Sequence, residues 1–280
     1  LDSPLLRIFI YELAFLQNDA AKMAQQVAWG AGKSGVEDVL LASEADTAAY
    51  FGRLGKAREF SRQAVASAER AQEKETAASY EAEAALREAL FGNAPQARQR
   101  AAAALSLSNG RDVQYGAALA LVFAGDAARA QAEKLTDDLA KRSPEDTIVQ
   151  FSYLPTIHAQ LALSRSNASK AIKALQAAAP YELGSSFVSL YPVYVRGEAY
   201  LSAHQGSAAA AEFQKIFDHP GVVLNQTIGA LVHLQLGRAY VLDDKDKARA
   251  AYQDFLTLWK DADPDIPILK EAKAEYEKLQ

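Results

Sequence analysis

The stretch Arg196-Gly197-Glu198-Ala199-Tyr200 is followed by Ala209, Phe213 and Ile216, and the same order returns in Leu236-Gly237-Arg238-Ala239-Tyr240, followed by Ala248, Tyr252 and Phe255. Each copy places a small residue and an aromatic one on a first segment, then an alanine and an aromatic residue four positions apart on a second. Apolar residues at this spacing predict two amphipathic helices per copy. Similar segments recur along the chain about every 40 residues, which predicts a stack of helical hairpins.

The first copy matches the tetratricopeptide pattern, in which helix A carries Leu-Gly-x-x-Tyr and helix B carries Ala-x-x-x-Phe with a later proline. Ala209 follows Gly197 by 12 residues, Phe213 follows Ala209 by 4, and Pro220 ends the unit. The second copy is one residue shorter in the turn between its helices, at 243–245. Turns accept such deletions more easily than helix faces do.

Weaker copies of the template place the small residue of helix A at Ala159, Ala118, Ala85 and Ala45, with a poor match at Phe9. The sequence therefore predicts an all-α fold, a right-handed tetratricopeptide-like α-solenoid of about seven helical hairpins in one domain spanning 1–280. The expected ranges are 4–30, 37–70, 75–107, 112–142, 147–179, 186–218 and 225–260, with a capping helix at 264–279. In such a stack each hairpin is expected to pack only against its neighbours.

Serine and proline residues mark several expected helix ends. Ser3-Pro4 predicts an N-cap followed by proline in the first helical position. Pro155 and Pro192 fall near the start of expected A helices, where proline is tolerated only within the first turn. These two helices are expected to begin late or to kink.

Composition narrows the classes of function. The net charge of −5 gives no basic track for nucleic acid or anionic lipid, so a nucleic-acid partner is not expected. The absence of cysteine removes disulfides, thiolate nucleophiles and zinc clusters. No apolar run approaches the roughly 20 residues that a membrane helix needs, so membrane insertion by this segment is not expected. The chain opens on Leu1 at a helix cap, which suggests a piece of a longer protein whose membrane anchor or catalytic domain lies upstream.

Motif-like strings in the sequence lack the residues that their chemistry needs. The run at 30–35, Gly-Ala-Gly-Lys-Ser-Gly, has Val27 where a phosphate-binding loop requires glycine, and 261–265 lacks the glycine and glutamate of a calcium loop. The four histidines are scattered over different hairpins, and Glu81, Glu83 and Glu88 are expected on a solvated face. We therefore expect no catalytic residue, no cofactor and no metal site in this chain.

Tyrosines collect at the positions of the A helices that line the concave side of tetratricopeptide arrays. Tyrosine supplies a large contact area and a hydrogen bond at low entropic cost, and is therefore common at interfaces. The candidate peptide-binding groove comprises Tyr115, Tyr153, Gln160, Tyr191, Tyr194, Glu198 and Arg238. The alternative is that Pro192 and the loop at 181–189 shift the register, so that some of these tyrosines pack between hairpins. The helix-A positions expected to line the groove lack the Lys and Asn residues of a chaperone-type carboxylate clamp.

Several stretches resemble one group, the C-terminal tetratricopeptide regions of bacterial eukaryote-like serine/threonine protein kinases of the acidobacterial type. The stretches that carry the resemblance are 13–17 (LAFLQ), 23–28 (MAQQVA), 46–58 (DTAAYFGRLGKAR), 196–201 (RGEAYL) and 252–267 (YQDFLTLWKDADPDIP). The resemblance implies a parent with an N-terminal kinase domain, attached to the bacterial inner membrane by an upstream helix. No kinase Gly-rich loop, H-R-D or D-F-G triplet occurs in this sequence, so no kinase chemistry is assigned to its residues.

The sequence thus predicts a non-catalytic scaffold or sensor that binds a protein or peptide, as the regulatory region of a signalling kinase. The alternatives are the sensor of a bacterial transcription regulator and a free-standing adaptor, because similar arrays follow winged-helix domains. A hydrolase in the groove would require a histidine clustered with carboxylates, a pattern that this sequence does not show.

Overall fold

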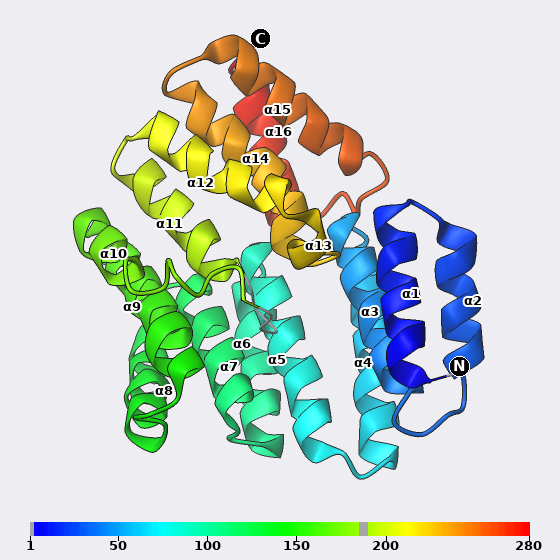
Figure 1. The fold of residues 1–280 in the computed structure, drawn as a ribbon. Coiled ribbons are helices and arrows are strands. Elements are labelled where there is room, and N and C mark those ends of the chain that lie inside the picture. The colour runs from blue at the N-terminus through cyan, green and yellow to red at the C-terminus, as the bar shows by residue number, and fades with distance from the viewer. Residues whose placement is uncertain (1–2, 185–189) are drawn as a thin grey trace.

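The computed structural model describes residues 3–184 and 190–280, and within them the chain is all-helical (Figure 1). Consecutive helices pack as antiparallel pairs, and α16 follows the last pair. The helices are α1 (Pro4–Leu16), α2 (Ala20–Gly30), α3 (Glu37–Tyr50), α4 (Leu54–Arg70), α5 (Lys74–Leu90), α6 (Ala94–Leu107), α7 (Arg111–Phe123), α8 (Arg129–Arg142), α9 (Leu154–Leu163), α10 (Ala168–Leu175), α11 (Tyr191–Ser202), α12 (Gly206–Asp218), α13 (Pro220–Val223), α14 (Thr227–Val241), α15 (Lys245–Leu258) and α16 (Pro267–Glu277). Two short elements, η1 (Asp126–Ala128) and η2 (Val149–Tyr153), precede α8 and α9.

Local sequence signals set the ends of several helices. The Ser3 side chain accepts a hydrogen bond from the backbone N–H of Leu6, with Pro4 as the first helical residue, so the expected N-cap is confirmed. Before Pro155 the chain makes one π-helical turn, η2, because proline removes a backbone donor from the regular ladder. Helix α11 begins at Tyr191, directly before Pro192, and the expected start of its hairpin at 186 lies outside the described residues.

Small residues let the two helices of a pair approach closely. A Cβ added at Gly197 on α11 would overlap the ring of Phe213 on α12, and one at Gly237 on α14 would lie 2.8 Å from the ring of Tyr252 on α15. Fully buried alanines occupy the alanine positions of the repeat on the second helices of earlier pairs, among them Ala57, Ala97 and Ala101. The alanine and glycine positions of the repeat are therefore helix-crossing points.

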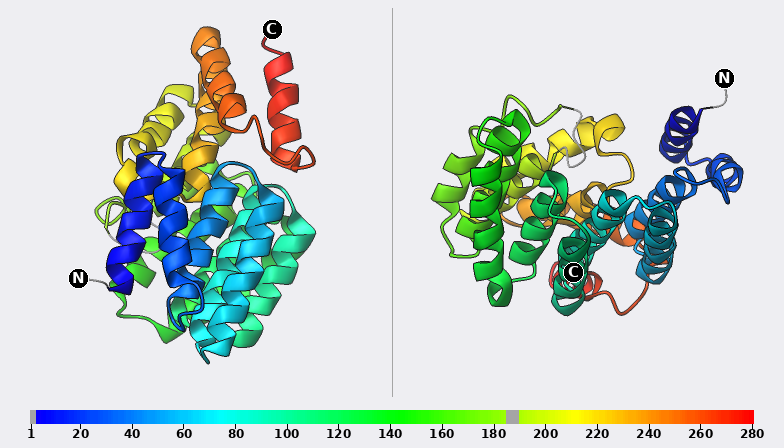
Figure 2. Two further views of the ribbon diagram at one scale, coloured as in Figure 1. Left: turned by 90° about the vertical axis from the view of Figure 1, so that its right-hand side faces the viewer. Right: turned by 90° about the horizontal axis from the view of Figure 1, so that it is seen from below.

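The expectation that hairpins contact only their neighbours in sequence is wrong. The segment between α15 and α16 lies against the ends of α3, α4 and α5, as Figure 2 shows in its left view. The Asp263 carboxylate accepts a hydrogen bond from the backbone N–H of Gly55 (2.6 Å). The backbone N–H of Asp263 donates to the carbonyl oxygen of Gly52 (3.0 Å). The backbone N–H of Ile268 reaches the carbonyl of Phe91 (3.3 Å). The stack therefore curves until its C-terminal part meets its second and third helix pairs.

One large hydrophobic core follows this closure. It runs from Ala48 on α3 to Ala272 on α16 and includes Phe91 and Trp259, whose rings meet edge to face at 5.0 Å. A smaller cluster joins α1, α2 and the start of α3. The first helix pair thus sits outside the closed stack, attached through α3 (Figure 1).

Candidate binding surface

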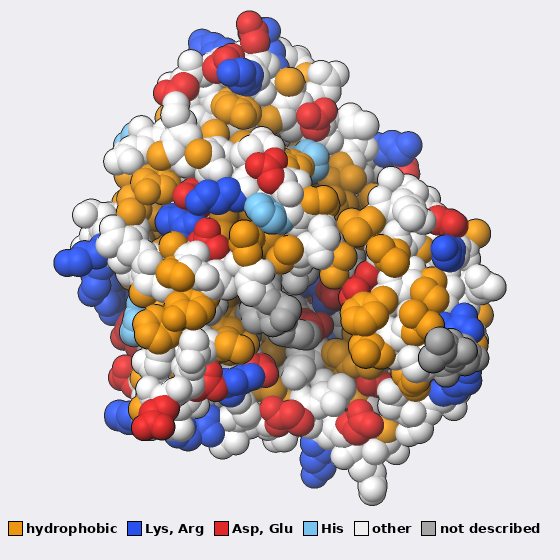
Figure 3. Space-filling model, in the orientation of Figure 1, with side chains coloured by type: hydrophobic (Ala, Val, Ile, Leu, Met, Phe, Trp, Pro, Cys, Tyr) orange, Lys and Arg blue, Asp and Glu red, His pale blue; other side chains and the backbone are white. Residues whose placement is uncertain are grey.

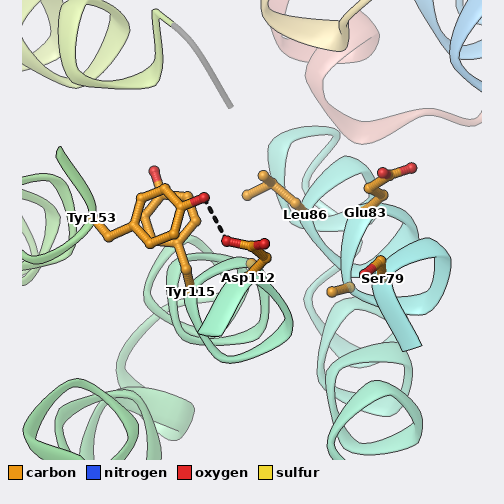
Figure 4. Close-up of a pocket in the computed structure, with 8 residues that line it drawn as sticks. Ser79, Glu83, Leu86, Asp112, Tyr115 and Tyr153 are labelled. Atoms are coloured by element: carbon orange, nitrogen blue, oxygen red, sulfur yellow. Dashed lines mark hydrogen bonds between the residues drawn. The ribbon is translucent and has the colours of Figure 1, made fainter. Parts of the chain in front are cut away.

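The stacked rings of Tyr115 on α7 and Tyr153 in η2 form the centre of the expected groove (Figure 4). Their centroids lie 3.9 Å apart at an interplanar angle of 11°, and the Tyr153 hydroxyl donates a 2.8 Å hydrogen bond to Asp112 Oδ1. The cavity beside them, also lined by Ser79, Glu83 and Leu86, holds about 20 Å³. That volume accommodates about one water molecule, so no peptide side chain fits there.

All four tyrosines of the expected groove are buried. Their exposed fractions are 1% for Tyr115, 2% for Tyr153, 5% for Tyr191 and 1% for Tyr194. The Tyr194 hydroxyl accepts a 2.9 Å bond from Gln235 Nε2 on α14, and its ring lies edge-on to Phe213. Burial favours the alternative in which these side chains pack between hairpins, since a ring with almost no accessible surface offers a peptide nothing to contact.

The expected polar residues of the groove also contact other helices. Arg238 makes a bidentate ion pair with Glu275 of α16, at 2.9 and 3.0 Å. Glu198 Oε1 accepts from Gln235 Nε2 at 3.2 Å, while Glu198 Oε2 and Gln160 Oε1 are buried without a hydrogen-bond partner. Burial raises the pKa of Glu198 to about 8, although the nearby Arg238 opposes the shift.

Four of these seven residues therefore form two internal networks. One joins Tyr115 and Tyr153 to Asp112, and the other joins Tyr194 and Glu198 through Gln235, with Arg238 turned toward α16. Burial raises the pKa of Tyr191, and the proximity of Tyr115 adds to the shift. The tyrosines that were expected on an open concave face therefore lie in the interior.

Helix α5 carries buried charges where the sequence predicted a solvated face. Glu81, Arg87 and Glu88 are all at least nine-tenths buried. Arg87 bonds Asp46 at 2.9 Å and Ser61 Oγ at 3.0 Å. The solvated-face expectation is wrong because α5 is covered by α4, α6 and α7.

The carboxyl groups of Asp46 and Glu83 share this interior. Desolvation raises the pKa of Asp46, and Arg87 partly offsets the shift. Burial also raises the pKa of Glu83 well above its usual value, and the negative charge of Asp46 adds to that shift. The arrangement is one ion pair beside a second acid, a structural network rather than a nucleophile aligned with a base.

The surface that the sequence reasoning missed is the outward face of α1. Its large apolar side chains are exposed, at 60% for Leu5, 50% for Phe9 and 55% for Leu13, with Leu6 and Leu16 at 39%. Figure 3 shows hydrophobic side chains gathered over this helix. The signal was present in the sequence, because 4–16 contains only two charged residues, Arg7 and Glu12.

Neither a metal cluster nor a membrane span emerges from the described residues. Within 3–184 and 190–280 no group of three or more His, Asp or Glu side chains is arranged to hold a metal ion. No helix there combines the length and apolar character that crossing a bilayer requires.

No protein-family model matches this chain, and a search of curated proteins found no match either.

Proposed function

We propose that this chain is a non-catalytic module that binds a protein or peptide, built as a right-handed tetratricopeptide-like α-solenoid whose C-terminal part closes onto its second and third hairpins. The further proposal is that it serves as the regulatory region of a bacterial serine/threonine protein kinase. Both rest on residues of the described chain and on the sequence resemblance.

The close crossing of α11 and α12 supports the tetratricopeptide assignment most directly. The pattern places a small residue on helix A against a large one on helix B. Gly197 and Phe213 meet in that way, and Gly237 and Tyr252 repeat the contact one pair later. A chance similarity of composition would not reproduce the same helix-to-helix contact twice at the same motif positions.

The internal networks support a scaffold rather than an enzyme. Two carboxyl groups with strongly raised pKa values, Glu198 and Glu83, lie in the interior, and the cavity near Glu83 holds only about 20 Å³. Substrates usually occupy pockets of at least several hundred Å³. The clefts of that size among the described residues open at the surface, for example the one of about 360 Å³ beside His158 and Lys170, and we therefore place partner binding on the outer surface.

Selection of helical peptides on the immobilised chain, followed by calorimetry with the purified peptides, tests the binding function. We expect saturable binding with a dissociation constant of roughly micromolar strength, typical of a single helix docked on a surface. The absence of any saturable peptide or protein ligand would contradict the binding function.

Isolation of the endogenous protein with an antibody against this chain tests the proposed parent. Mass spectrometry of that polypeptide is expected to yield peptides of a kinase catalytic domain. Peptides of a winged-helix domain in the same polypeptide would contradict the kinase assignment.

A further inference from the structure

Helix α1 exposes far more apolar surface than its neighbours in the stack. Of the ten large hydrophobic side chains that are exposed within residues 3–184 and 190–280, five lie on α1. Leu5, Phe9, Leu13 and Leu16 follow one another at intervals of four, four and three residues. This spacing places them on one face of the helix, along about 16 Å of its axis.

The opposite face of α1 packs inside the protein. Tyr11, Ala14 and Phe15 are buried against α2 and α3, and the Tyr11 hydroxyl donates to Glu44 Oε1 at 2.8 Å. The helix is thus apolar on both sides. Helices that are apolar all round are normally buried, and exposed apolar patches of several hundred Å² often mark binding sites.

The size of the stripe selects the kind of partner. A large aromatic side chain buries about 150–250 Å² when fully covered, and four of the five exposed residues are the smaller leucine, so these half-exposed side chains supply at most about 500 Å². A stable interface between two globular proteins needs about 800 Å² from each partner. The stripe is therefore too small to hold a second copy of the chain by itself, and it fits one helix lying along α1.

The charged residue beside the stripe indicates which charge a partner should carry at the contact. Glu12 borders Leu16 and Leu5 on the helix surface and is half-buried. Its pKa is raised by desolvation alone, with no basic side chain opposing the shift. The other charged residue, Arg7, is turned to α2, where it donates to Gln26 at 3.1 Å and lies over the Trp29 ring. A positive group from a partner would compensate Glu12.

We propose that the outward face of α1 docks a single amphipathic helix of a partner protein, with apolar residues spaced by three or four positions and a lysine or arginine placed against Glu12. This inference rests on the proposed binding function and adds the surface and the chemistry of the ligand.

Two synthetic peptides of equal composition, made of leucine and lysine, test the inference by calorimetry. In one the leucines repeat every three or four residues to form a single helical face, and in the other their order is scrambled. The patterned peptide is expected to bind at least tenfold more tightly than the scrambled one. The double variant Phe9→Glu with Leu13→Glu is expected to weaken that binding at least tenfold.

A matched variant distinguishes binding at α1 from nonspecific binding to any exposed apolar side chains. Val241 and Leu242 form another exposed apolar pair, at the end of α14, and Val241→Glu with Leu242→Glu is expected to leave peptide binding unchanged. Glu12→Gln is expected to weaken binding of the lysine peptide severalfold and to spare a peptide with glutamine in place of lysine. Circular dichroism of each variant establishes that it is folded.

The same variants give different results if something other than a partner helix binds the outward face of α1. If Phe9→Glu with Leu13→Glu leaves peptide binding intact, the site lies elsewhere: the inference fails while the binding function stands. If light scattering shows a dimer that this variant dissociates, the occupant is a second copy and the inference fails. Loss of binding to anionic vesicles in the same variant, with no effect on the peptide, would assign the face to a membrane and overturn the inference.

Discussion

Trp259 Nε1 donates a 2.9 Å hydrogen bond to the carbonyl oxygen of Tyr50, a residue 209 positions earlier in the chain. Trp259 ends the pair α14–α15, and Tyr50 ends α3. Asn225 adds a second link across the same junction, since its Nδ2 donates to the Ser43 carbonyl and to Thr47 Oγ1, both at 3.0 Å. These bonds hold the C-terminal helices against the N-terminal half of the stack.

Replacing Trp259 with phenylalanine is expected to destabilise the protein by about 1–2 kcal/mol, because the Tyr50 carbonyl loses its buried donor. Urea unfolding measures the change. Trp29→Phe is the matched control, since Trp29 is only half-buried, and a smaller loss is expected there. Equal effects of the two substitutions would contradict a structural role for the junction.

Gly197→Ala is expected to cost about 1–3 kcal/mol, because the new methyl group overlaps the Phe213 ring and overpacks the crossing of α11 and α12. Gly221→Ala in α13 meets no atom within 4 Å and is expected to change stability by less than about 0.5 kcal/mol. Thermal unfolding of the two variants checks the difference. Further substitution of Phe213 by leucine is expected to restore part of the loss in Gly197→Ala.

Stability is expected to fall as the pH rises toward 8, owing to Glu198. Its folded-state pKa of about 8 lies above the usual value of about 4.5, so between these values the folded protein holds a proton that the unfolded chain has released. This contribution is complete below pH 4.5 and is lost by about pH 8. Glu198→Gln is expected to flatten the dependence and to stabilise the protein at pH 8 by on the order of 3 kcal/mol. Urea midpoints between pH 5 and pH 9 measure it, and an unchanged slope in the variant would rule Glu198 out as its source.

Arg87→Met is expected to cost about 3–5 kcal/mol, because it leaves the Asp46 carboxylate without its buried partner. Arg70→Met removes an ion pair of similar length to Glu37, but Arg70 is 66% exposed, and a loss below about 1 kcal/mol is expected. Denaturant titration of both variants at neutral pH makes the comparison. Similar losses would mean that burial of the Arg87 pair has no energetic consequence.

The all-helical fold could be predicted because its signals are local. Apolar spacing, the Ser3 cap and the small residues Gly197 and Gly237 act within one helix pair, where neighbouring segments determine the packing. The closure could not be predicted in this way. It arises from small rotations between successive pairs, which add up over the whole stack before Trp259 meets Tyr50.

The positions of the groove residues followed from the same template, but their exposure depended on the closure. Tyr194 and Arg238 occupy A helices as expected, and only the curvature of the stack decides that they face Gln235 and Glu275 instead of a ligand. The stripe on α1 could have been found from the sequence, since 4–16 has apolar residues on every side. Comparison with the tetratricopeptide template did not bring out this pattern, because the template fits the first segment poorly.

Cross-linking tests the closed arrangement most directly, because the chain contains no cysteine of its own. Arg53 and Asp261 are exposed side chains on opposite sides of the junction, 3.9 Å apart at their charged ends. In the double variant Arg53→Cys with Asp261→Cys, a short bis-maleimide is expected to join the two cysteines within one monomer in high yield, as peptide mass spectrometry would show. If the monomer carries two separately modified cysteines and no internal link, the C-terminal helices do not close onto the N-terminal half.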